Sequence, residues 1–328
     1  MKAEFEKYLN DPEGYYRNLY GELGIREKAD GIIKSFGSMA EPIQYTNQLW
    51  YSKTKPVLPS IITLNAGVER EKVASVGAAI DVLWTLSVVV DDIQDKDETR
   101  RSKPAAWRVY GAEQTYKSAE AGLGATVKFL GREIGLLASK ACIDSVNLGM
   151  SSIKNHQAFD LSVRPAVLHR NYWERDAFFS ALPIEVLLPN LDDKTRQAGL
   201  ACLEHYYIGG QLGNDLQDLI RPEADGKLRL SDVRNGLVTI PIQKLWSQLN
   251  ESEKPDFEKA FGSKDFDEAD HDAIKTMVEN HSLGEQVIVD ITQSYEQAKR
   301  LSAVVMSGDD QQIFESLCES QKSKFLAK

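Results

Sequence analysis

The feature that most constrains the fold is a long apolar segment, residues 69–96, which ends in a cluster of carboxylates. It contains the apolar run Val82 to Val90, and Asp91, Asp92 and Asp95 follow directly. Apolar and polar residues do not alternate along it, so the pattern predicts a helix rather than a strand. On a helix, Asp91 and Asp95 lie at i and i+4 and share one face, with Asp92 about 100° round. We therefore expect a buried helix whose C-terminal end presents carboxylates.

The charges at this end of the predicted helix are typical of a site for metal and phosphate. Carboxylate oxygens suit Mg²⁺, which usually keeps waters and substrate phosphates as its other ligands. Arg100 and Arg101 follow the carboxylates closely, and the planar guanidinium group recognises phosphate oxygens. The alternative interpretation is a solvated helix end of mixed charge, because charge runs are usually surface features.

A second acidic cluster lies near the end of another long predicted helix, residues 193–221. Asn214 and Asp218 are at i and i+4, Asp215 lies beside them, and Gln211 precedes them by one turn. Oxygen-bearing side chains therefore again share one side of a helix. Carboxylates are unfavourable at a helix C-terminus, where the dipole is already negative. Two such clusters favour bound metal ions around one diphosphate, which would stabilise charge on a departing pyrophosphate.

The rest of the chain also has helical patterns, and we expect no sheet. Further helices are expected over residues 2–35, 112–138, 140–160, 171–189 and 265–325, the first with an interruption near Asp11–Gly14. A loop is expected at residues 222–232, and breaks between helices are expected at Lys55–Pro59 and Arg100–Pro104. Ser60 is expected to cap the helix after the first break. No low-complexity linker and no repeat of 20–50 residues divides the chain. The sequence therefore predicts one all-α domain, residues 1–328.

Composition excludes several classes of protein. The net charge of −10 argues against a nucleic-acid binder. A mean hydropathy of −0.36 fits a soluble globular protein. The three cysteines form no C-x-x-C pair, so we expect neither a zinc site nor a disulfide framework, and the cytoplasm is the expected compartment. The N-terminus is too charged for a signal peptide. We expect no membrane span, because no apolar run approaches the roughly 20 residues required.

In order and spacing, the motifs resemble those of the trans-isoprenyl diphosphate synthases, which are prenyltransferases with the class I terpenoid synthase fold. The first motif of that family is D-D-x-x-D followed by R-R-G-x-P, and it matches Asp91–Asp95 and Arg100–Pro104 with Ser102 in place of Gly. The second motif, Q-x-x-D-D-x-x-D, matches Gln211–Asp218 with Asn214 in place of the first Asp.

Shorter motifs extend the resemblance to about residues 50–245. Gln157–Leu161 is similar to the family's Q-x-x-D-L, and Gly226-Lys227 is similar to its G-K. Gly236–Pro241 is similar to its G-K-x-T-L-P. The resemblance implies an all-α class I isoprenoid synthase, a helical bundle around a central cavity, and a homodimer.

The resemblance also implies Mg²⁺-dependent ionisation of an allylic prenyl diphosphate and transfer of its chain to isopentenyl diphosphate. About three Mg²⁺ ions would be bound, and the matched metal positions are Asp91, Asp92, Asp95, Asn214, Asp215 and Asp218. Arg100 and Lys227 would contact the allylic diphosphate, and Arg101 that of isopentenyl diphosphate. Gln157 and Gln211 belong to the matched substrate-binding motifs.

Departures from the family pattern concentrate at positions that bind the two diphosphates. An early Lys of the family is Ser52 here and the following Arg is Lys55. The His or Gln seven residues before the first Asp pair is Trp84, which cannot accept a hydrogen bond. The Lys of a K-T pair is Phe179, and the Lys of the last motif is Leu237. The isopentenyl diphosphate site is therefore eroded.

Three functions remain open on the sequence. In the first, the chain is a prenyl diphosphate synthase in which Lys53, Lys55 or Lys103 compensates for the departures. A shift of one residue in the match to the family motif would let Lys53 take the place of the family's lysine. Alternatively, it cyclises one prenyl diphosphate or passes it to a different acceptor. A non-catalytic partner subunit is a third class, which the largely intact Asp motifs disfavour. Leu86 and Ser87 hold family positions that line the chain pocket and neither is aromatic, so we expect a product of about C20.

Overall fold

The computed structural model describes residues 2–49, 53–220 and 230–326. In chain order, the elements are α1 (Lys2–Asn10), α2 (Pro12–Glu22), α3 (Ile25–Lys34), the 3₁₀ helix η1 (Gly37–Met39), α4 (Glu41–Leu49), α5 (Thr54–Asn65), α6 (Arg70–Gln94), β1 (Thr99–Arg100), β2 (Lys103–Pro104), α7 (Ala106–Tyr110), α8 (Ala112–Glu133), α9 (Leu136–His156), α10 (Pro165–Tyr172), the π-helix η2 (Trp173–Ala177), the 3₁₀ helix η3 (Phe178–Ala181), α11 (Leu182–Leu187), α12 (Asp193–Ile220), α13 (Ser231–Arg234), α14 (Ile240–Gln248), α15 (Lys254–Ala260), α16 (Glu268–Asn280), α17 (Leu283–Val305) and α18 (Gly308–Leu326). The predicted all-α class is confirmed.

The chain divides into two compact units, each assembled from three segments. Unit 1 comprises Met1–Val146, Phe178–Leu203 and Lys299–Leu317. Unit 2 comprises Asn147–Ala177, Glu204–Ala298 and Cys318–Lys328. The single domain expected from the sequence stays a prediction.

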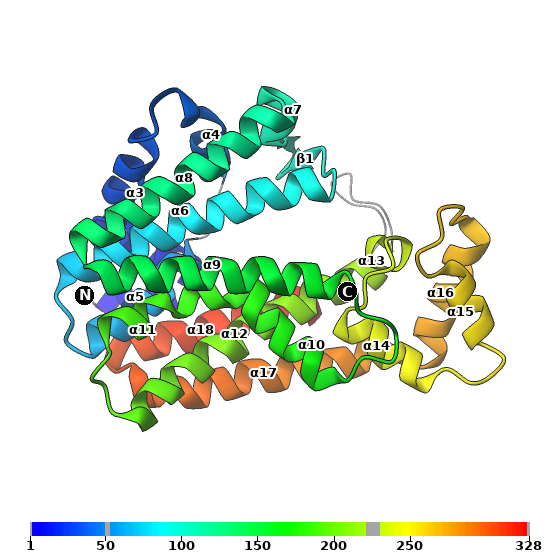
Figure 1. Cartoon of the computed structure of the whole chain (residues 1–328). Coiled ribbons are helices and arrows are strands. Elements are labelled where there is room, and N and C mark those ends of the chain that lie inside the picture. Colours follow the sequence, from blue (N-terminus) through cyan, green and yellow to red (C-terminus); the bar gives the residue numbers. More distant parts are fainter. Residues whose placement is uncertain (1, 50–52, 221–229, 327–328) are drawn as a thin grey trace. The chain divides into compact units, whose positions relative to one another are not determined.

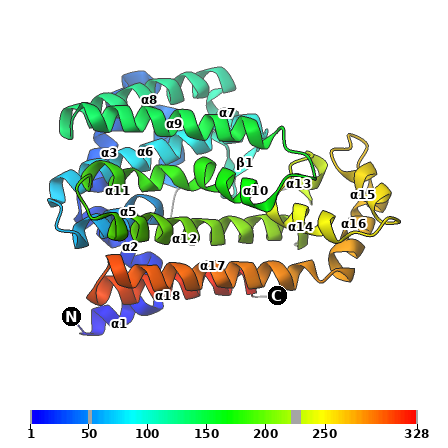
Figure 2. The ribbon, with the colours of Figure 1, turned by 60° about the horizontal axis from the view of Figure 1, so that its bottom comes forward.

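The core of unit 1 is built around α6, the helix predicted from the apolar segment. Contacts with α3, α5 and α8 surround it, and Figures 1 and 2 show α8 running alongside it. Small residues allow close packing at this contact: a Cβ added to Gly122 of α8 would lie 2.7 Å from Leu86 Cδ2 of α6. Because α6 is packed in the core of unit 1, its C-terminal end, which carries the carboxylates, is held in a fixed orientation within this unit.

Among the described residues, α6 is long and apolar enough to cross a membrane, but 83% of its apolar window is buried in the protein. The expectation that no apolar run approaches a spanning length is therefore wrong for this helix. Asp81 is the only charged residue between Val73 and Val90, and it is 2% exposed. The burial identifies α6 as a core helix.

The connection after α6 contains a small sheet, although no sheet was expected. β1 and β2 pair antiparallel with Arg100 opposite Lys103. Arg101 and Ser102 form the two-residue loop, with φ of 53° and 61°. Two-residue hairpin turns of this kind need positive φ at both central positions and prefer Gly. Ser102, where the family pattern has Gly, therefore adopts a conformation that is unfavourable for an L-residue.

A second correction concerns the predicted break at Lys55–Pro59, which is instead part of the continuous helix α5. Pro56 lies in the first turn, where a backbone N–H has no partner within the helix. Pro59 lies inside the helix, and the Ser60 hydroxyl donates to the Pro56 carbonyl at 2.7 Å. Ser60 therefore does not cap the helix, which begins at Thr54.

The segment expected to be one helix over residues 171–189 is interrupted, and its parts belong to different units: residues up to Ala177 to unit 2 and residues from Phe178 to unit 1. α10 begins earlier, with Pro165 in its first turn, and η2 and η3 follow before α11. The π-helical turn inserts an extra residue, a feature often found at functional sites. Figure 1 shows α10 beside α14.

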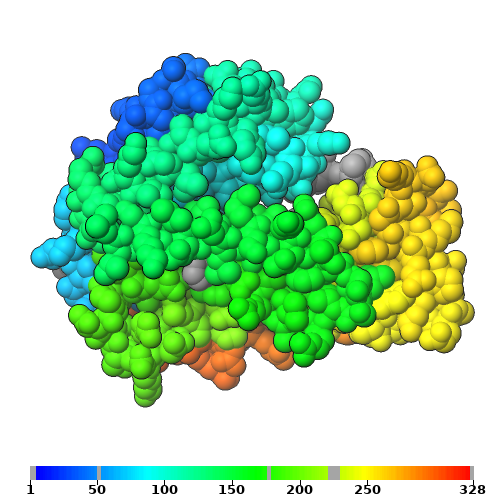
Figure 3. All heavy atoms as spheres, viewed as in Figure 1, coloured from blue at the N-terminus to red at the C-terminus, as the bar shows by residue number. Residues whose placement is uncertain are grey.

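Close packing explains Gly209 of α12. A Cβ added to Gly209 would lie 3.2 Å from Tyr295 Cζ of α17, and Figure 2 shows these helices side by side. The helix continues without a break through this glycine. Elsewhere in this unit, α15 and α16 contact one another and form a continuous yellow and orange surface in Figure 3.

Candidate functional site

The first acidic cluster lies at the C-terminal end of α6, as predicted. Asp91 and Asp95 are exposed, whereas Asp92 is 1% exposed. The helix stops because Lys96 adopts a φ of 58° and the Asp97 N–H donates to the Asp92 carbonyl at 3.0 Å, a closure typical of helix C-termini. Two carboxylates one turn apart therefore face solvent, with a third held inside.

The hairpin brings Arg100 back onto this cluster. Its Nε donates to Asp92 Oδ1 at 2.9 Å, and its Nη2 also donates to that oxygen. Nη2 lies 3.3 Å from Asp97 Oδ2. Burial lowers the pKa of Arg100, but the hydrogen bond and charge of Asp92 outweigh it and raise the pKa overall. Arg100 thus remains a cation and orients Asp92.

In unit 2, Asp215 of the second cluster is 4% exposed and fixed by two side chains. Gln211 Nε2 donates to its Oδ1 at 2.8 Å, as their i and i+4 spacing allows. The Tyr172 hydroxyl donates to Asp215 Oδ2 and accepts the Ile240 N–H at 2.9 Å. Burial and the nearby charge of Asp215 raise the pKa of Tyr172. Tyr172 therefore remains a neutral donor.

The other members of the second cluster differ in exposure and bonding. Asn214 is exposed. Asp218 Oδ1 accepts the Ser231 N–H at 3.0 Å and the Ser231 hydroxyl at 2.5 Å, and its Oδ2 accepts the Asp232 N–H at 3.0 Å. Asp218 therefore anchors the start of α13.

The donor sets of both clusters fit Mg²⁺. Mg²⁺ takes oxygen ligands and is usually held by one or two carboxylates with waters and phosphates. Asp91 and Asp95 are exposed and offer such oxygens. The carboxylate of Asp215 already accepts hydrogen bonds, but an ionised carboxylate offers about four lone-pair sites. The metal assignment of these residues stays a prediction.

Lys53, which could compensate for the lost isopentenyl diphosphate contact, lies in a buried ion pair. It is 7% exposed, and its Nζ is 3.0 Å from Asp81 Oδ1 and 3.2 Å from Oδ2. Asp81 Oδ2 also accepts the Tyr20 hydroxyl at 2.7 Å and Asn47 Nδ2 at 2.9 Å. In this arrangement the Lys53 charge faces Asp81.

Two of the departures from the family pattern contact each other. Lys55 Nζ lies 3.4 Å from the centroid of the Trp84 ring. A Trp face attracts an ammonium group electrostatically. The substitutions at these two positions therefore form one cation–π pair in unit 1.

The remaining predicted substrate-binding residues have diverse environments. Leu86 and Phe179 are buried at 5% and 8% exposure. Ser87 is partly exposed, and its hydroxyl donates to the Trp84 carbonyl at 2.8 Å. Gln157 is exposed just after α9, and Arg101 is exposed in the hairpin turn. Leu237 is partly exposed before α14. Ser52 and Lys227 lie outside the described residues, so their assignments stay predictions.

Three residues that contact predicted site residues or their neighbours were not predicted from the sequence. Asp81 was not singled out, although a lone charge inside an apolar helix signals a buried partner. Tyr172 was not expected to bond to a carboxylate of the second cluster, because Asp215 lies 43 residues away in the sequence. Arg175 gave no signal because its partner, His156, lies far away in the sequence.

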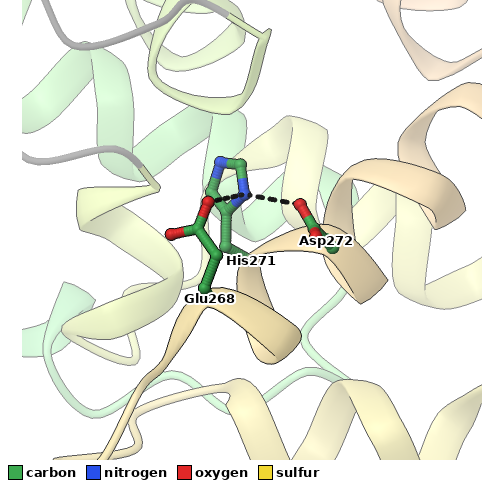
Figure 4. Close-up of side chains that lie close together, drawn as sticks. All are labelled: Glu268, His271 and Asp272. Atoms are coloured by element: carbon green, nitrogen blue, oxygen red, sulfur yellow. Dashed lines mark hydrogen bonds and ion pairs between the residues drawn. The ribbon is translucent and has the colours of Figure 1, made fainter.

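A further group of metal-type side chains lies outside these clusters, on α16. Glu268, His271 and Asp272 place one ligand atom each within 4.8 Å of one another, and Figure 4 shows both carboxylates beside the imidazole. Glu268 and Asp272 are highly exposed, at 81% and 72%. Acidic residues are favoured in a first helical turn by the helix dipole, so the cluster is explained as an exposed helix start.

Comparisons with known proteins identify the family of this chain. The polyprenyl synthetase family model matches residues 51–280. The chain is 27% identical over 286 residues to a geranylgeranyl diphosphate synthase of Sulfolobus acidocaldarius, covering 82% of this chain and 86% of that one. It is 49% identical over 116 residues to the geranylgeranyl pyrophosphate synthase paxG of Penicillium paxilli, covering 35% of this chain and 31% of that one.

A solved structure shows the same fold. A polyprenyl synthase of Caulobacter crescentus superposes with a TM-score of 0.82 at 17% identity, and the match covers 94% of this chain and 96% of that one. At that identity the likeness concerns the fold alone, and it confirms the class I isoprenoid synthase fold. Because the family model spans more than half of the chain and includes both acidic motifs, the chain belongs to the polyprenyl synthetase family.

Proposed function

We propose that the protein is a Mg²⁺-dependent prenyl diphosphate synthase that transfers an allylic prenyl chain to isopentenyl diphosphate. The observation that carries this proposal is the pair of acidic motifs, both ordered on long helices, within a family match that spans residues 51–280. Relatives that match most of the chain are named geranylgeranyl diphosphate synthases. These names favour elongation over cyclisation and over an inactive subunit, and support a product of about C20.

Each of the two clusters would offer oxygen ligands to Mg²⁺. Asp91 near the end of α6 and Asp95 directly after that helix are exposed carboxylates, and Asp215 is fixed by Gln211 and Tyr172. The chemistry that bound Mg²⁺ supplies is neutralisation of negative charge on the departing pyrophosphate. The structure of the Caulobacter crescentus polyprenyl synthase was solved with calcium and isoprenyl diphosphate bound. This supports the proposal that a divalent ion binds here together with a prenyl diphosphate.

The side chains of this chain would bind and orient the substrates. Arg100 holds Asp92 through two hydrogen bonds and remains charged, so it can contribute positive charge beside the diphosphate. Lys55, held on Trp84, is a cation at the position expected to bind isopentenyl diphosphate. The apolar residues of α6 around Leu86 would keep water from the reacting chain.

We also propose that the active form is a cytoplasmic homodimer. On α9, Leu136, Ile143 and Met150 recur every seven residues, which places them on one helical face. Their exposed fractions are 85%, 44% and 46%. Such a stripe on a surface helix suits burial against a second copy. Light scattering of the purified protein should give a dimer mass, and a monomer at micromolar concentration would refute this part.

Product analysis tests the main proposal. Farnesyl or geranylgeranyl diphosphate is incubated with Mg²⁺, with and without isopentenyl diphosphate. Consumption only when isopentenyl diphosphate is present supports elongation, whereas a hydrocarbon or alcohol formed without it supports cyclisation. Asp91→Ala should reduce turnover at least about a hundredfold, because it removes a metal ligand. Near-wild-type turnover by this variant would show that the metal assignment is wrong.

A further inference from the structure

An aromatic side chain of the C-terminal helix packs on a glycine of the second acidic motif. A Cβ added to Gly213 of α12 would lie 2.5 Å from Phe325 Cε2 of α18, and still closer to its Cε1 and Cζ. Real Cβ atoms essentially never approach another atom within 3.0 Å. Both residues belong to unit 2. The tip of the Phe325 ring therefore occupies the space that the Cβ of any other residue at position 213 would need.

This contact explains a glycine in the interior of a long helix. Glycine is unfavourable inside a helix, because its backbone loses the most conformational freedom on folding, yet α12 continues through Gly213 to Ile220. Gly209 lies at i and Gly213 at i+4, so they share one face of α12. A Cβ added to Gly209 would lie 3.2 Å from Tyr295 Cζ. One face of this helix thus receives aromatic rings from both α17 and α18.

Gly213 lies within the turn that carries the oxygen ligands of the second cluster. Gln211 and Asp215, on either side of it, are joined by a hydrogen bond of 2.8 Å from Nε2 to Oδ1. Asn214 follows it directly and is exposed. The amide of Asn214 offers one acceptor oxygen, whereas a carboxylate offers two. A rotation of this turn would therefore point that single oxygen away from a bound ion.

We propose that Phe325 is a positioning residue for the second acidic cluster: its ring, seated on Gly213, holds the turn that carries Asn214 and Asp215. The inference rests on the proposed function, because it needs Mg²⁺ and a diphosphate at this cluster. The Phe325 side chain has no oxygen or nitrogen, so it acts through the backbone of α12. Groups that orient metal ligands in this indirect way affect metal affinity. The end of α18 thereby contributes to the metal site of unit 2.

Three variants separate positioning from simple packing. Phe325→Ala removes the ring, Gly213→Ala forces the ring from its place, and the double variant removes the clash that Gly213→Ala creates. The matched control is Gly210→Ala on the same helix, because a Cβ there would lie 3.7 Å from Tyr295 Oη, an ordinary contact. Calorimetry gives the Kd of inorganic pyrophosphate at a fixed Mg²⁺ concentration. Turnover gives the KM and kcat for farnesyl diphosphate, and circular dichroism gives the melting temperature without ligand.

Phe325→Ala should raise the Kd of pyrophosphate about tenfold, the lower end of the range typical of groups that orient metal ligands. A loss of packing alone would instead lower the melting temperature and leave this Kd unchanged. Gly213→Ala should raise the Kd at least as much. The double variant should bind pyrophosphate no more weakly than Phe325→Ala, since residues in contact have non-additive effects. Gly210→Ala should keep the wild-type Kd.

The inference is overturned if Phe325→Ala keeps the wild-type Kd, whatever its melting temperature. It is also overturned if the effects of the two single substitutions add in the double variant. If Phe325→Ala does not fold, the Kd of Gly213→Ala is compared with that of Gly210→Ala, and equal values overturn the inference. Failure of the proposed function is a separate result: wild type would then consume no allylic diphosphate, with or without isopentenyl diphosphate.

Discussion

Removal of the positive charge of Lys53 should destabilise the protein strongly. Lys53 and Asp81 are 7% and 2% exposed, and their charged atoms lie 3.0 Å apart. Truncation of one partner of a buried ion pair typically costs about 3–5 kcal/mol, because the other charge stays buried without compensation. In the Lys53→Met variant, the Tyr20 hydroxyl and Asn47 still donate to Asp81. We therefore expect this substitution to lower the free energy of unfolding by about 3 kcal/mol, the lower end of that range.

A double-mutant cycle separates this mechanism from a simple loss of packing. Asp81→Asn removes the orphaned charge and keeps an oxygen that accepts from Tyr20. The variant with both Lys53→Met and Asp81→Asn should therefore be more stable than Lys53→Met alone, with a coupling energy of about 2–3 kcal/mol. Urea unfolding followed by circular dichroism gives the four free energies.

The matched control is Lys28→Met, also in unit 1. Lys28 pairs with Glu71 at 2.5 Å, but Glu71 is 77% exposed, and exposed pairs contribute about 0–1 kcal/mol. The reasoning is refuted if Lys53→Met costs no more than this control and the coupling energy is near zero. If that variant instead raised the KM for isopentenyl diphosphate alone, Lys53 would serve the substrate rather than the core.

Three further outcomes are expected. Ser102→Gly should raise the free energy of unfolding by about 1 kcal/mol, because Ser102 has a φ of 61°; no gain in chemical denaturation would argue against strain at this turn. Gly122→Ala should cost about 1–3 kcal/mol, since its Cβ would lie 2.7 Å from Leu86 Cδ2; an unchanged melting temperature would show that α6 and α8 adjust freely. Burial raises the pKa of Cys202 to about 12, so at pH 8 only about one thiol in ten thousand is ionised; Ellman's reagent should modify Cys202 only after unfolding, and rapid reaction of the native protein would contradict its burial.

Local patterns in the sequence predicted the elements on which the clusters lie. The apolar run before Asp91 predicted α6 to within about two residues at each end, because helix periodicity is a local property. The i and i+4 spacings of the two clusters likewise follow from helix geometry alone. The prediction was wrong at Lys55–Pro59, where two prolines suggested a break but α5 is continuous. The first turn of this helix tolerates Pro56, and the Ser60 hydroxyl donates to the Pro56 carbonyl.

The chain alone thus determined where the carboxylates lie along two helices, and which family carries that spacing. Only the tertiary structure decided which charge meets which: Lys53 meets Asp81, 28 residues away, and Arg175 meets His156, 19 residues away. Electrostatic attraction depends on distance in space and on burial, neither of which sequence separation records. The same motif therefore leaves Asp91 exposed and holds Asp92 on Arg100.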